Sequence, residues 1–289
     1  MRSEGAVVAS EADVAAQDDL ARIFAANRAQ GKVALSVAHR DGRTRPERLH
    51  EAGSLRVRFP RSRTSALEAV MVNTAGGIAG GDCFEIELTA GTDAQITVTS
   101  AAAEKVYRSS GPDARIRVAL NVRPGGSIAW LPQETIVFNR ARIARSIEVD
   151  LAKEARLIIA EAVIFGRLGM GEVVEAGRLV DFWRVRQQGR LVFAETTRLD
   201  GAIAEKLREP AVAKGGVGIA TLLVVPADAA LVDMVRSLDG DFGGEIGISA
   251  WNGLALVRFC AKDGATLRRD LSTVLTALPG QSLPRLWCN

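Results

Sequence analysis

The 289-residue chain has few of the residue types that metal stores, disulfide-bonded domains and sugar-binding enzymes need. Its three cysteines, Cys83, Cys260 and Cys288, lie far apart, and it has only two histidines. Neither a disulfide framework nor a Cys-x-x-Cys zinc site can be built from them, and a reducing compartment is the natural setting. Aromatic residues make up 5% of the chain, so the core must consist of Val, Ile, Leu and Ala.

The sequence also lacks long apolar runs and a strong excess of one charge. Its longest nearly uncharged apolar run, around 217–225, is too short to cross a bilayer. The N-terminus has no basic-then-apolar signal pattern. The net charge of +3 is too small to demand a nucleic-acid partner. We therefore expect a soluble, cytoplasmic protein with neither nucleic-acid nor membrane partners.

A change of composition along the chain suggests how it is organised. Residues 1–30 are rich in acidic and small residues, with an Ala-rich stretch that could form a short helix, and we expect a mobile leader there. Residues 31–289 are expected to form a single domain. Its 31–225 part reads as β-rich, and its 226–289 part as mixed α/β.

Alternating apolar and polar residues predict a succession of strands from residue 69 to residue 199. Turn sequences such as Ala90-Gly-Thr-Asp93 and Arg123-Pro-Gly-Gly126 separate them. No long helical period occurs in this stretch, which argues against a doubly wound parallel sheet. The expected strands are Cys83–Leu88, Gln95–Thr99, Arg115–Val122, Ile143–Leu151, Leu157–Ala160, Val173–Arg186 and Leu191–Thr197.

The C-terminal part changes character. Two amphipathic helices are expected at Ala227–Leu238 and Ala265–Leu278, the first favoured by Asp228 at its start. One strand, Ile246–Cys260, is expected between them. The apolar tail Leu283–Trp287 should pack against the body of the domain.

Three segments of the β-rich part resemble one another. Each has a polar turn, a strand, a Glu, an apolar stretch containing Tyr or Phe, and an Arg. The strand positions Ile96, Ile128 and Leu157 are 32 and 29 residues apart. A period near 30 indicates stacked coils, so the predicted fold is mainly β: a β-solenoid or layered sheets, with two C-terminal α-helices.

In-register stacking of these coils would place Glu104, Glu134 and Glu161 in one column. Adjacent strands lie about 4.8 Å apart, so the carboxylates would repel unless they are compensated. One interpretation is an ion-pair ladder with the arginine that follows each glutamate: Arg108, Arg140 and Arg167. The other is a transiently bound cation, because oxygen ligands without histidine or thiolate hold divalent ions weakly.

A basic segment lies between Arg40 and Arg63, with eight arginines and three acidic residues. One interpretation is a solvated edge strand, Leu55–Phe59, with Arg56 and Arg58 on its outer face. The other is a docking patch for an acidic partner.

The string Asn73-Thr-Ala-Gly-Gly-Ile-Ala-Gly-Gly-Asp82 contains four glycines but lacks the Gly-Lys-Ser/Thr of a phosphate-binding loop. Strands are expected on both sides, so its glycines fit a sharp corner that needs positive φ angles. Asp82 could cap that corner or face a partner.

The motifs of common catalytic sites are missing. No Gly-x-Ser-x-Gly elbow occurs. The many acidic residues leave a glycosidase-type carboxylate pair open, so a β-solenoid carbohydrate-active enzyme is one alternative. A binding module built on the basic edge is another, and it would show salt-dependent retention on polyanions.

Several motifs stand in an order typical of one family. They are Asn73–Asp82, Ala103-Glu-Lys-Val-Tyr-Arg-Ser109, Trp130-Leu-Pro-Gln-Glu-Thr-Ile-Val-Phe138, Glu161 with Phe165-Gly-Arg167, and Leu283-Pro-Arg-Leu-Trp287. Together they resemble the UreD (UreH) family of urease accessory proteins from about Val33 to Trp287. The 130–138 string is the most specific of them.

The resemblance implies a non-enzymatic chaperone. Members of that family bind apo-urease and recruit UreF and, through it, the nickel-carrying GTPase UreG, so that GTP hydrolysis drives nickel insertion. An internal nickel passage is implied as well, with no tightly bound cofactor. We therefore expect Glu134, Glu161 and, less directly, Glu104 to contact nickel in transit. Asp82, Tyr107, Arg108, Arg56 and Arg58 are the expected partner-binding residues.

Overall fold

The computed structural model describes residues 27–61, 64–238, 240, 242–280 and 283–287. The expected leader, residues 1–30, lies outside the described residues apart from its last four, and Gln30 already begins the first strand. In the described part of the chain, no helix is long and apolar enough to cross a membrane.

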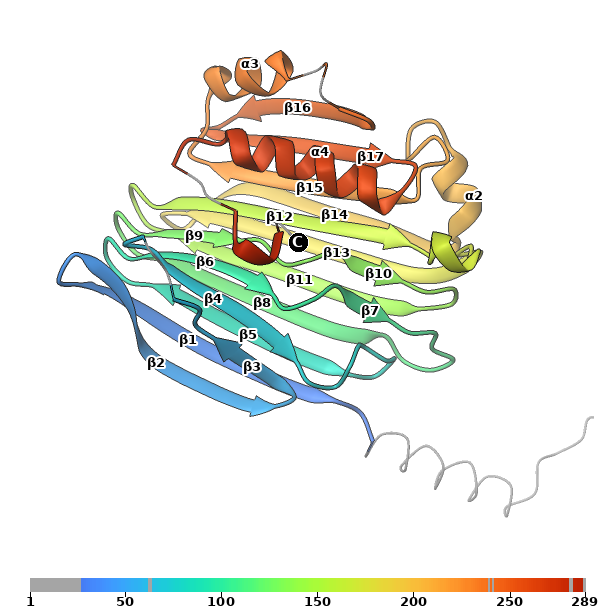
Figure 1. The fold of residues 1–289 in the computed structure, drawn as a ribbon, viewed down its shortest axis with the longest axis horizontal. Coiled ribbons are helices and arrows are strands. Elements are labelled where there is room, and N and C mark those ends of the chain that lie inside the picture. Colours follow the sequence, from blue (N-terminus) through green and yellow to red (C-terminus); the bar gives the residue numbers. More distant parts are fainter. Residues whose placement is uncertain (1–26, 62–63, 239, 241, 281–282, 288–289) are drawn as a thin grey trace, which may run out of the picture.

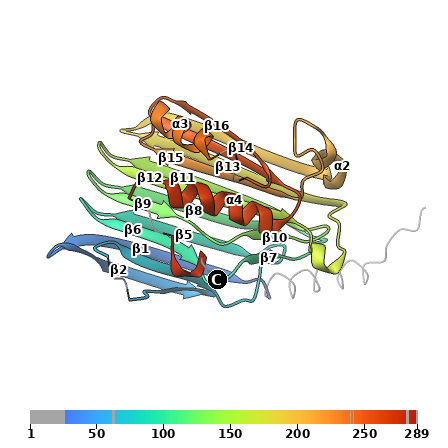
Figure 2. The ribbon, with the colours of Figure 1, turned by 45° about the horizontal axis from the view of Figure 1, so that its top comes forward.

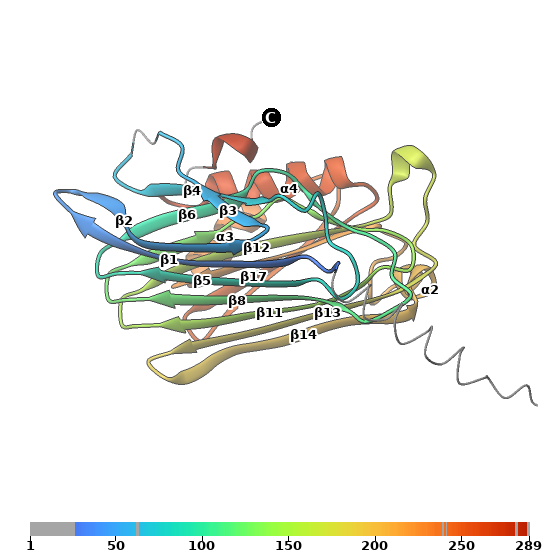
Figure 3. The ribbon, with the colours of Figure 1, turned by 90° about the horizontal axis from the view of Figure 1, so that it is seen from below.

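Two β-sheets face each other as layers (Figure 3). The first, sheet A, has seven strands among the described residues, in the order β14-β13-β11-β8-β5-β1-β2. Its strands are β1 (Gln30–Arg40), β2 (Arg43–Gly53), β5 (Cys83–Ala90), β8 (Ala114–Val122), β11 (Arg142–Leu151), β13 (Ala176–Gln187) and β14 (Arg190–Ala202).

The second sheet, sheet B, runs in the order β16-β17-β15-β12-β9-β6-β4-β3, and β10 and β7 extend it beside β12. Its strands are β3 (Leu55–Arg58), β4 (Leu67–Asn73), β6 (Gln95–Ser100), β7 (Glu104–Val106), β9 (Ser127–Trp130), β10 (Thr135–Val137), β12 (Arg156–Phe165), β15 (Gly218–Val225), β16 (Glu245–Trp251) and β17 (Leu254–Ala261).

The chain winds between the sheets as a solenoid. It passes from β5 to β6, returns to β8, and repeats the path through β9 and β11 to β12, so that corresponding strands pair in parallel. Ile96 lies opposite Ile128, and Ile128 lies opposite Leu157, all three buried. The stacking inferred from the repeat is confirmed, and so is the mainly β fold.

The core between the sheets follows from the two-residue period of the strands. In β1, Val33, Leu35 and Val37 are buried, while the residues between them are half-buried or exposed. Strand β12 is buried on both faces, because sheet A covers one and helix α4 (Gly264–Ala277) contacts the other. Figure 3 shows α4 on the outer side of sheet B.

Two helices pack against the last strands of sheet B. The two expected helices are α3 (Ala229–Ser237), capped by Asp228, and α4, capped by Asp263. A short helix, α2 (Ile203–Arg208), was not predicted. Figure 1 shows α3 beside β16 and α4 across β15 and β17, and Figure 2 again shows α3 beside β16.

The single strand expected at Ile246–Cys260 is wrong. The segment 246–260 is a hairpin of β16 and β17 rather than a single strand. Asn252 and Gly253 have positive φ angles of 50° and 77° at the turn, which is the geometry that a two-residue hairpin needs.

Several local expectations are confirmed. Strand β3 is an edge strand beside β4. In the corner after β4, Gly76, Gly77 and Gly81 have positive φ angles. The C-terminal tail packs on the domain: Trp287 is 5% exposed, and its Nε1 donates to the carbonyl of Leu131 at 3.0 Å.

Candidate functional site

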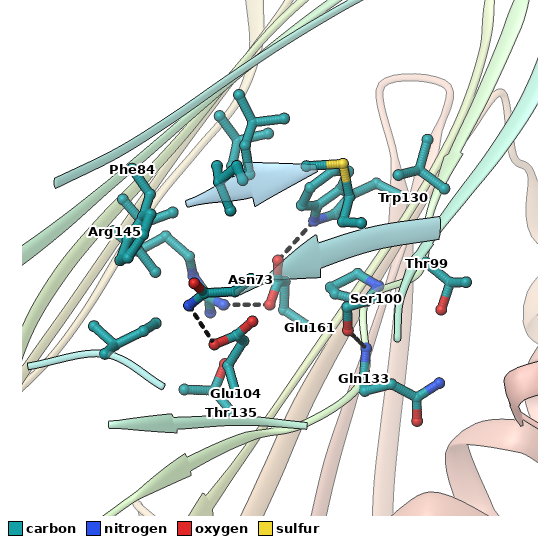
Figure 4. Close-up of a pocket in the computed structure, with 18 residues that line it drawn as sticks. Asn73, Phe84, Thr99, Ser100, Glu104, Trp130, Gln133, Thr135, Arg145 and Glu161 are labelled. Atoms are coloured by element: carbon teal, nitrogen blue, oxygen red, sulfur yellow. Dashed lines mark hydrogen bonds and ion pairs between the residues drawn. The ribbon is translucent and has the colours of Figure 1, made fainter. Parts of the chain in front are cut away.

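The space between the sheets contains a cavity of about 80 Å³, which is lined mainly by apolar side chains with a few polar ones among them (Figure 4). Phe84, Ile86, Ile116 and Val118 line it from sheet A. Sheet B contributes apolar residues and a set of polar ones: Asn73, Thr99, Ser100, Glu104, Thr135 and Glu161. Two of the three glutamates predicted from the repeat therefore face one interior space.

Glu104, at the start of β7, lies in this cavity beside the end of β4. Asn73 Nδ2 donates to Glu104 Oε2 at 3.2 Å and to the carbonyl of Gly77 at 3.2 Å. Burial raises the pKa of Glu104, and the hydrogen bond from Asn73 opposes that rise. Among the described residues no cation pairs with this carboxyl group, and burial disfavours its charged form.

Glu161 lies on the inner face of β12 and is 4% exposed. Its Oε1 accepts a hydrogen bond of 2.7 Å from the Trp130 indole, and its Oε2 forms an ion pair with Arg145. Burial raises the pKa of Glu161, while the guanidinium of Arg145 and the indole counteract that rise. Glu161 is a buried carboxylate with both oxygens engaged.

Arg145 and Asp181 complete a buried charged triad with Glu161. Arg145 on β11 and Asp181 on β13 lie opposite each other in sheet A, and Nε of Arg145 donates to Asp181 Oδ1 at 3.1 Å. Nη2 of Arg145 donates a hydrogen bond to Oδ2 of the same carboxylate, and Trp183 Nε1 donates one to Oδ1 at 2.9 Å. Burial by itself would lower the pKa of Arg145. The two neighbouring carboxylates have the larger combined effect, so the pKa of Arg145 is raised overall.

The sequence interpretation missed both Arg145 and Asp181. The signal was available, since each occupies an inward position of an alternating strand, between Ile143 and Ile147 and between Leu179 and Trp183 respectively. A charge at such a position must be paired inside the fold.

The predicted column of three glutamates is wrong in register. Glu104 lies opposite Thr135, and Thr135 lies opposite Val163. Glu134 precedes Thr135, the residue aligned with Glu104, so its side chain points to the opposite face of the sheet. Glu161 lies two residues before Val163, so its side chain points to the same face as Glu104 but is not aligned with it.

The predicted ladder of arginines is also wrong. Arg167 pairs with Glu172 at 2.7 Å, not with Glu161. In the described part of the chain, neither Arg108 nor Arg140 forms an ion pair with Glu104 or Glu134. The compensating cations come from other elements because successive side chains of an extended segment point to opposite sides.

Glu134 is held at the junction with the C-terminal part instead. Arg268 of α4 donates through Nη1 to Glu134 Oε1 and to Gln133 Oε1, each at 2.7 Å. Its Nη2 donates to the carbonyls of Leu286 and Trp287, each at 3.2 Å. Glu134 does not line the cavity that Glu104 and Glu161 share.

The predicted partner-binding residues fall into two groups. Asp82 is 4% exposed and accepts hydrogen bonds from the backbone N–H groups of Ala29 and Ala79 at 2.9 and 2.7 Å. It shapes the glycine corner, which corrects the expectation that it faces a partner.

The other predicted partner-binding residues reach the surface. Tyr107 is 37% exposed and packs edge-on against Phe138 with ring centroids 5.3 Å apart. Arg108 is exposed beside it. Arg58 is exposed and Arg56 half-exposed on the edge strand β3.

The chemistry available in the cavity is that of two carboxyl groups: Glu104, which accepts from Asn73, and Glu161, which is paired with Arg145. Among the described residues, no group of three or more His, Cys, Asp or Glu side chains could hold a metal ion.

Comparison with known proteins places the chain in a family. The profile of the UreD urease accessory protein family matches residues 29–288. Urease accessory protein UreD of Rhodopseudomonas palustris strain HaA2 is 55% identical over 277 residues, which cover 96% of this chain and 99% of that protein. Urease accessory protein UreD 3 of Bradyrhizobium sp. strain BTAi1 is 55% identical over 269 residues, 93% of this chain and 97% of that protein. The chain therefore belongs to the UreD family of urease accessory proteins.

Proposed function

We propose that this protein acts in urease maturation as a cytoplasmic, non-catalytic chaperone. It binds apo-urease, acts with the accessory proteins UreF and UreG, and helps GTP-dependent insertion of nickel into the urease active site. Nickel is the cargo and passes through the space between the two sheets. Membership of the urease accessory family supports the maturation role.

The observation that carries the passage is the shared cavity of Glu104 and Glu161. A divalent cation leaving water for an apolar interior needs negatively charged oxygen atoms along its path. The cavity offers two carboxyl groups, those of Glu104 and Glu161, inside a β-sandwich whose remaining inner surface is largely apolar. Glu134, on the other face, stays attached to Arg268 and is not part of this path.

Two surfaces are proposed for docking. The edge strand β3 presents Arg56 and Arg58, which fit an acidic surface of a partner protein. Their guanidinium groups donate to nearby backbone carbonyls, at 2.6 Å to Leu55 and 2.7 Å to Val57 respectively, which holds them along the strand. The corner of Tyr107 and Arg108 is the second surface.

The maturation role is tested by co-expressing urease and the other accessory proteins with and without this chain. Nickel per urease active site and urease activity are measured. Nickel-poor, inactive urease only in the absence of the chain is the expected result. Full nickel loading without it would refute the role, and glycan turnover, the activity of the alternative solenoid enzyme, would then be assayed.

The passage is tested with Glu104→Gln and Glu161→Gln in the same co-expression. Both should lower nickel loading, while the complexes with urease and UreF persist. Glu87→Gln is the matched control, because Glu87 lies on the outer face of sheet A and pairs with Lys32 at 3.0 Å. Normal loading by folded Glu104→Gln and Glu161→Gln proteins would rule the passage out.

Docking is tested by charge reversal. Arg56→Glu with Arg58→Glu should weaken capture of the partner proteins, whereas Arg115→Glu with Arg117→Glu, two exposed arginines of β8, should not. Unchanged capture by the first double variant would remove the edge strand from the interface.

A further inference from the structure

The triad of Arg145, Glu161 and Asp181 divides the space between the sheets. On one side lies the cavity of about 80 Å³ that contains Glu104 (Figure 4). On the other lies a smaller cavity of about 20 Å³, lined by Asp181, Trp183 and Glu195 among others. Arg145 and Glu161 border both cavities, so the pair forms the partition between them.

The partition spans the two sheets. Arg145 and Asp181 are direct neighbours within sheet A, whereas Glu161 belongs to sheet B. The contact between Arg145 and Glu161 therefore bridges the sheets, and the contact between Arg145 and Asp181 does not. The bridge can be broken without disturbing the pairing of strands in either sheet.

The guanidinium is attached unequally to its two partners. Asp181 accepts from Nε and from Nη2, while Glu161 accepts from Nη1 alone. A guanidinium that presents two N–H groups to one carboxylate is held in both position and orientation. Arg145 is thus anchored on Asp181, and its contact with Glu161 is the one that can be exchanged.

Each carboxylate is also fixed by a tryptophan. Trp130 donates to Glu161 at 2.7 Å, and Trp183 donates to Asp181 at 2.9 Å. Such hydrogen bonds from outside hold a carboxylate in orientation when its principal partner changes. Glu161 can therefore keep its place when Nη1 leaves it.

A cation cannot cross the partition as it stands. The guanidinium of Arg145 is fully charged and buried, and it occupies the oxygen of Glu161 that a cation would use. Two positive charges a few ångströms apart repel strongly where water is excluded. The space between the sheets is therefore closed to cations while the ion pair between Arg145 and Glu161 is intact.

We propose that Arg145 is the barrier of the nickel passage and opens when a divalent cation in the larger cavity replaces Nη1 on Glu161, while Arg145 remains on Asp181. The inference rests on the proposed function, since it concerns the same interior path. Arg145 is a positioning and control residue in this scheme. The cation takes the place of the guanidinium on Glu161, and no covalent bond is made or broken.

The test removes the barrier while keeping the net charge of the triad. Arg145→Met with Asp181→Asn deletes one positive and one negative charge and leaves Glu161 with Trp130. The amide oxygen introduced at position 181 can still accept from the indole of Trp183. Purified apo-urease complexes assembled with this variant are titrated with Ni²⁺ in the presence of GTP, and nickel per active site is measured together with activity. The nickel concentration for half-maximal loading should fall roughly tenfold relative to the wild type, because the opposing charge is gone.

The matched control is Lys32→Met with Glu85→Gln. These residues also lie opposite each other on neighbouring strands of sheet A, but on its outer face, with Nζ and Oε2 3.3 Å apart. Its loading curve should coincide with that of the wild type. Arg145→Gln, with Asp181 intact, is a second opened variant in case the double variant does not fold, and the same shift is expected.

The outcomes separate the two proposals. If urease loads fully without this chain, the maturation role fails whatever the variants do. If the wild-type chain is needed but a folded opened variant loads nickel at the wild-type concentration, or less completely, the barrier is refuted and the passage is not.

Discussion

The indole Nε1 of Trp130 donates a 2.7 Å hydrogen bond to Oε1 of Glu161, and both groups are buried. Trp130 ends β9, which pairs in parallel with β12, the strand that carries Glu161. The solenoid thus places the donor one coil away from the acceptor. This contact fixes the glutamate that the proposed passage and its proposed barrier share.

Trp130→Phe removes this donor and leaves a buried carboxylate oxygen without one of its partners. The free energy of unfolding should fall by about 2 kcal/mol, the cost of one unsatisfied buried polar group. Urea denaturation measures it. Trp251→Phe is the control, because Trp251 is 39% exposed, and it should change stability little. Equal losses in the two variants would show that the indole bond contributes nothing specific.

Glu104→Gln should stabilise the protein at neutral pH. Burial raises the pKa of Glu104 in the folded state, so the folded state binds more protons than the unfolded state just above the unfolded pKa. The contribution of Glu104 to stability is therefore fully present below its unfolded-state pKa, and it is lost as the pH rises through its folded-state pKa. The variant should melt above the wild type at pH 7, and the gap should close below about pH 4.

A gap that is the same at pH 4 and pH 7 would contradict this account. The same variant is expected to lower nickel loading of urease, so gain of stability and loss of function should appear together. Glu87→Gln again serves as the control, since its side chain is 53% exposed, and its melting temperature should change little at either pH.

The repeat was readable from the sequence because each coil buries the same strand position. Ile96, Ile128 and Leu157 are spaced at the coil length, and the structure places them in one buried column. Their apolar character is dictated by the core between the sheets, so the period alone indicates stacked coils. The hairpin at 252–253 is not evident from the pattern of apolar residues, because its two-residue Asn-Gly turn lies within an apolar run.

The partners of the glutamates were not readable in the same way. Glu161 is paired by Arg145, which is 16 residues away in sequence and in the opposite sheet. Glu134 is paired by Arg268, 134 residues away on α4. An arginine closer to Glu161 in sequence, Arg167, pairs with Glu172 instead. Ion pairs across layers depend on how the sheets are superposed, and a single repeat period does not specify that.

Ile128→Ala tests the column on which the solenoid depends. Ile128 is 1% exposed and lies between Ile96 and Leu157. Its truncation leaves a cavity that the neighbouring coils hold open, so a loss of about 3 kcal/mol in unfolding free energy is expected. Ile136→Ala, at a half-buried position of β10, should cost clearly less. Comparable losses at the two sites would mean that the column is not a special element of stability.

Glu134 and Arg268 should behave as a coupled pair that is separate from the proposed nickel path. Arg268 joins Glu134 to the carbonyls of Leu286 and Trp287, so Arg268→Met should speed amide exchange in the C-terminal segment. In a double-mutant cycle with Glu134→Gln, the coupling in unfolding free energy should be about 1 kcal/mol, as for a partly exposed ion pair with charged hydrogen bonds. Glu134→Gln should leave nickel loading unchanged, in contrast to Glu161→Gln. A loss of loading in a folded Glu134→Gln protein would place the path on the α4 side of sheet B instead.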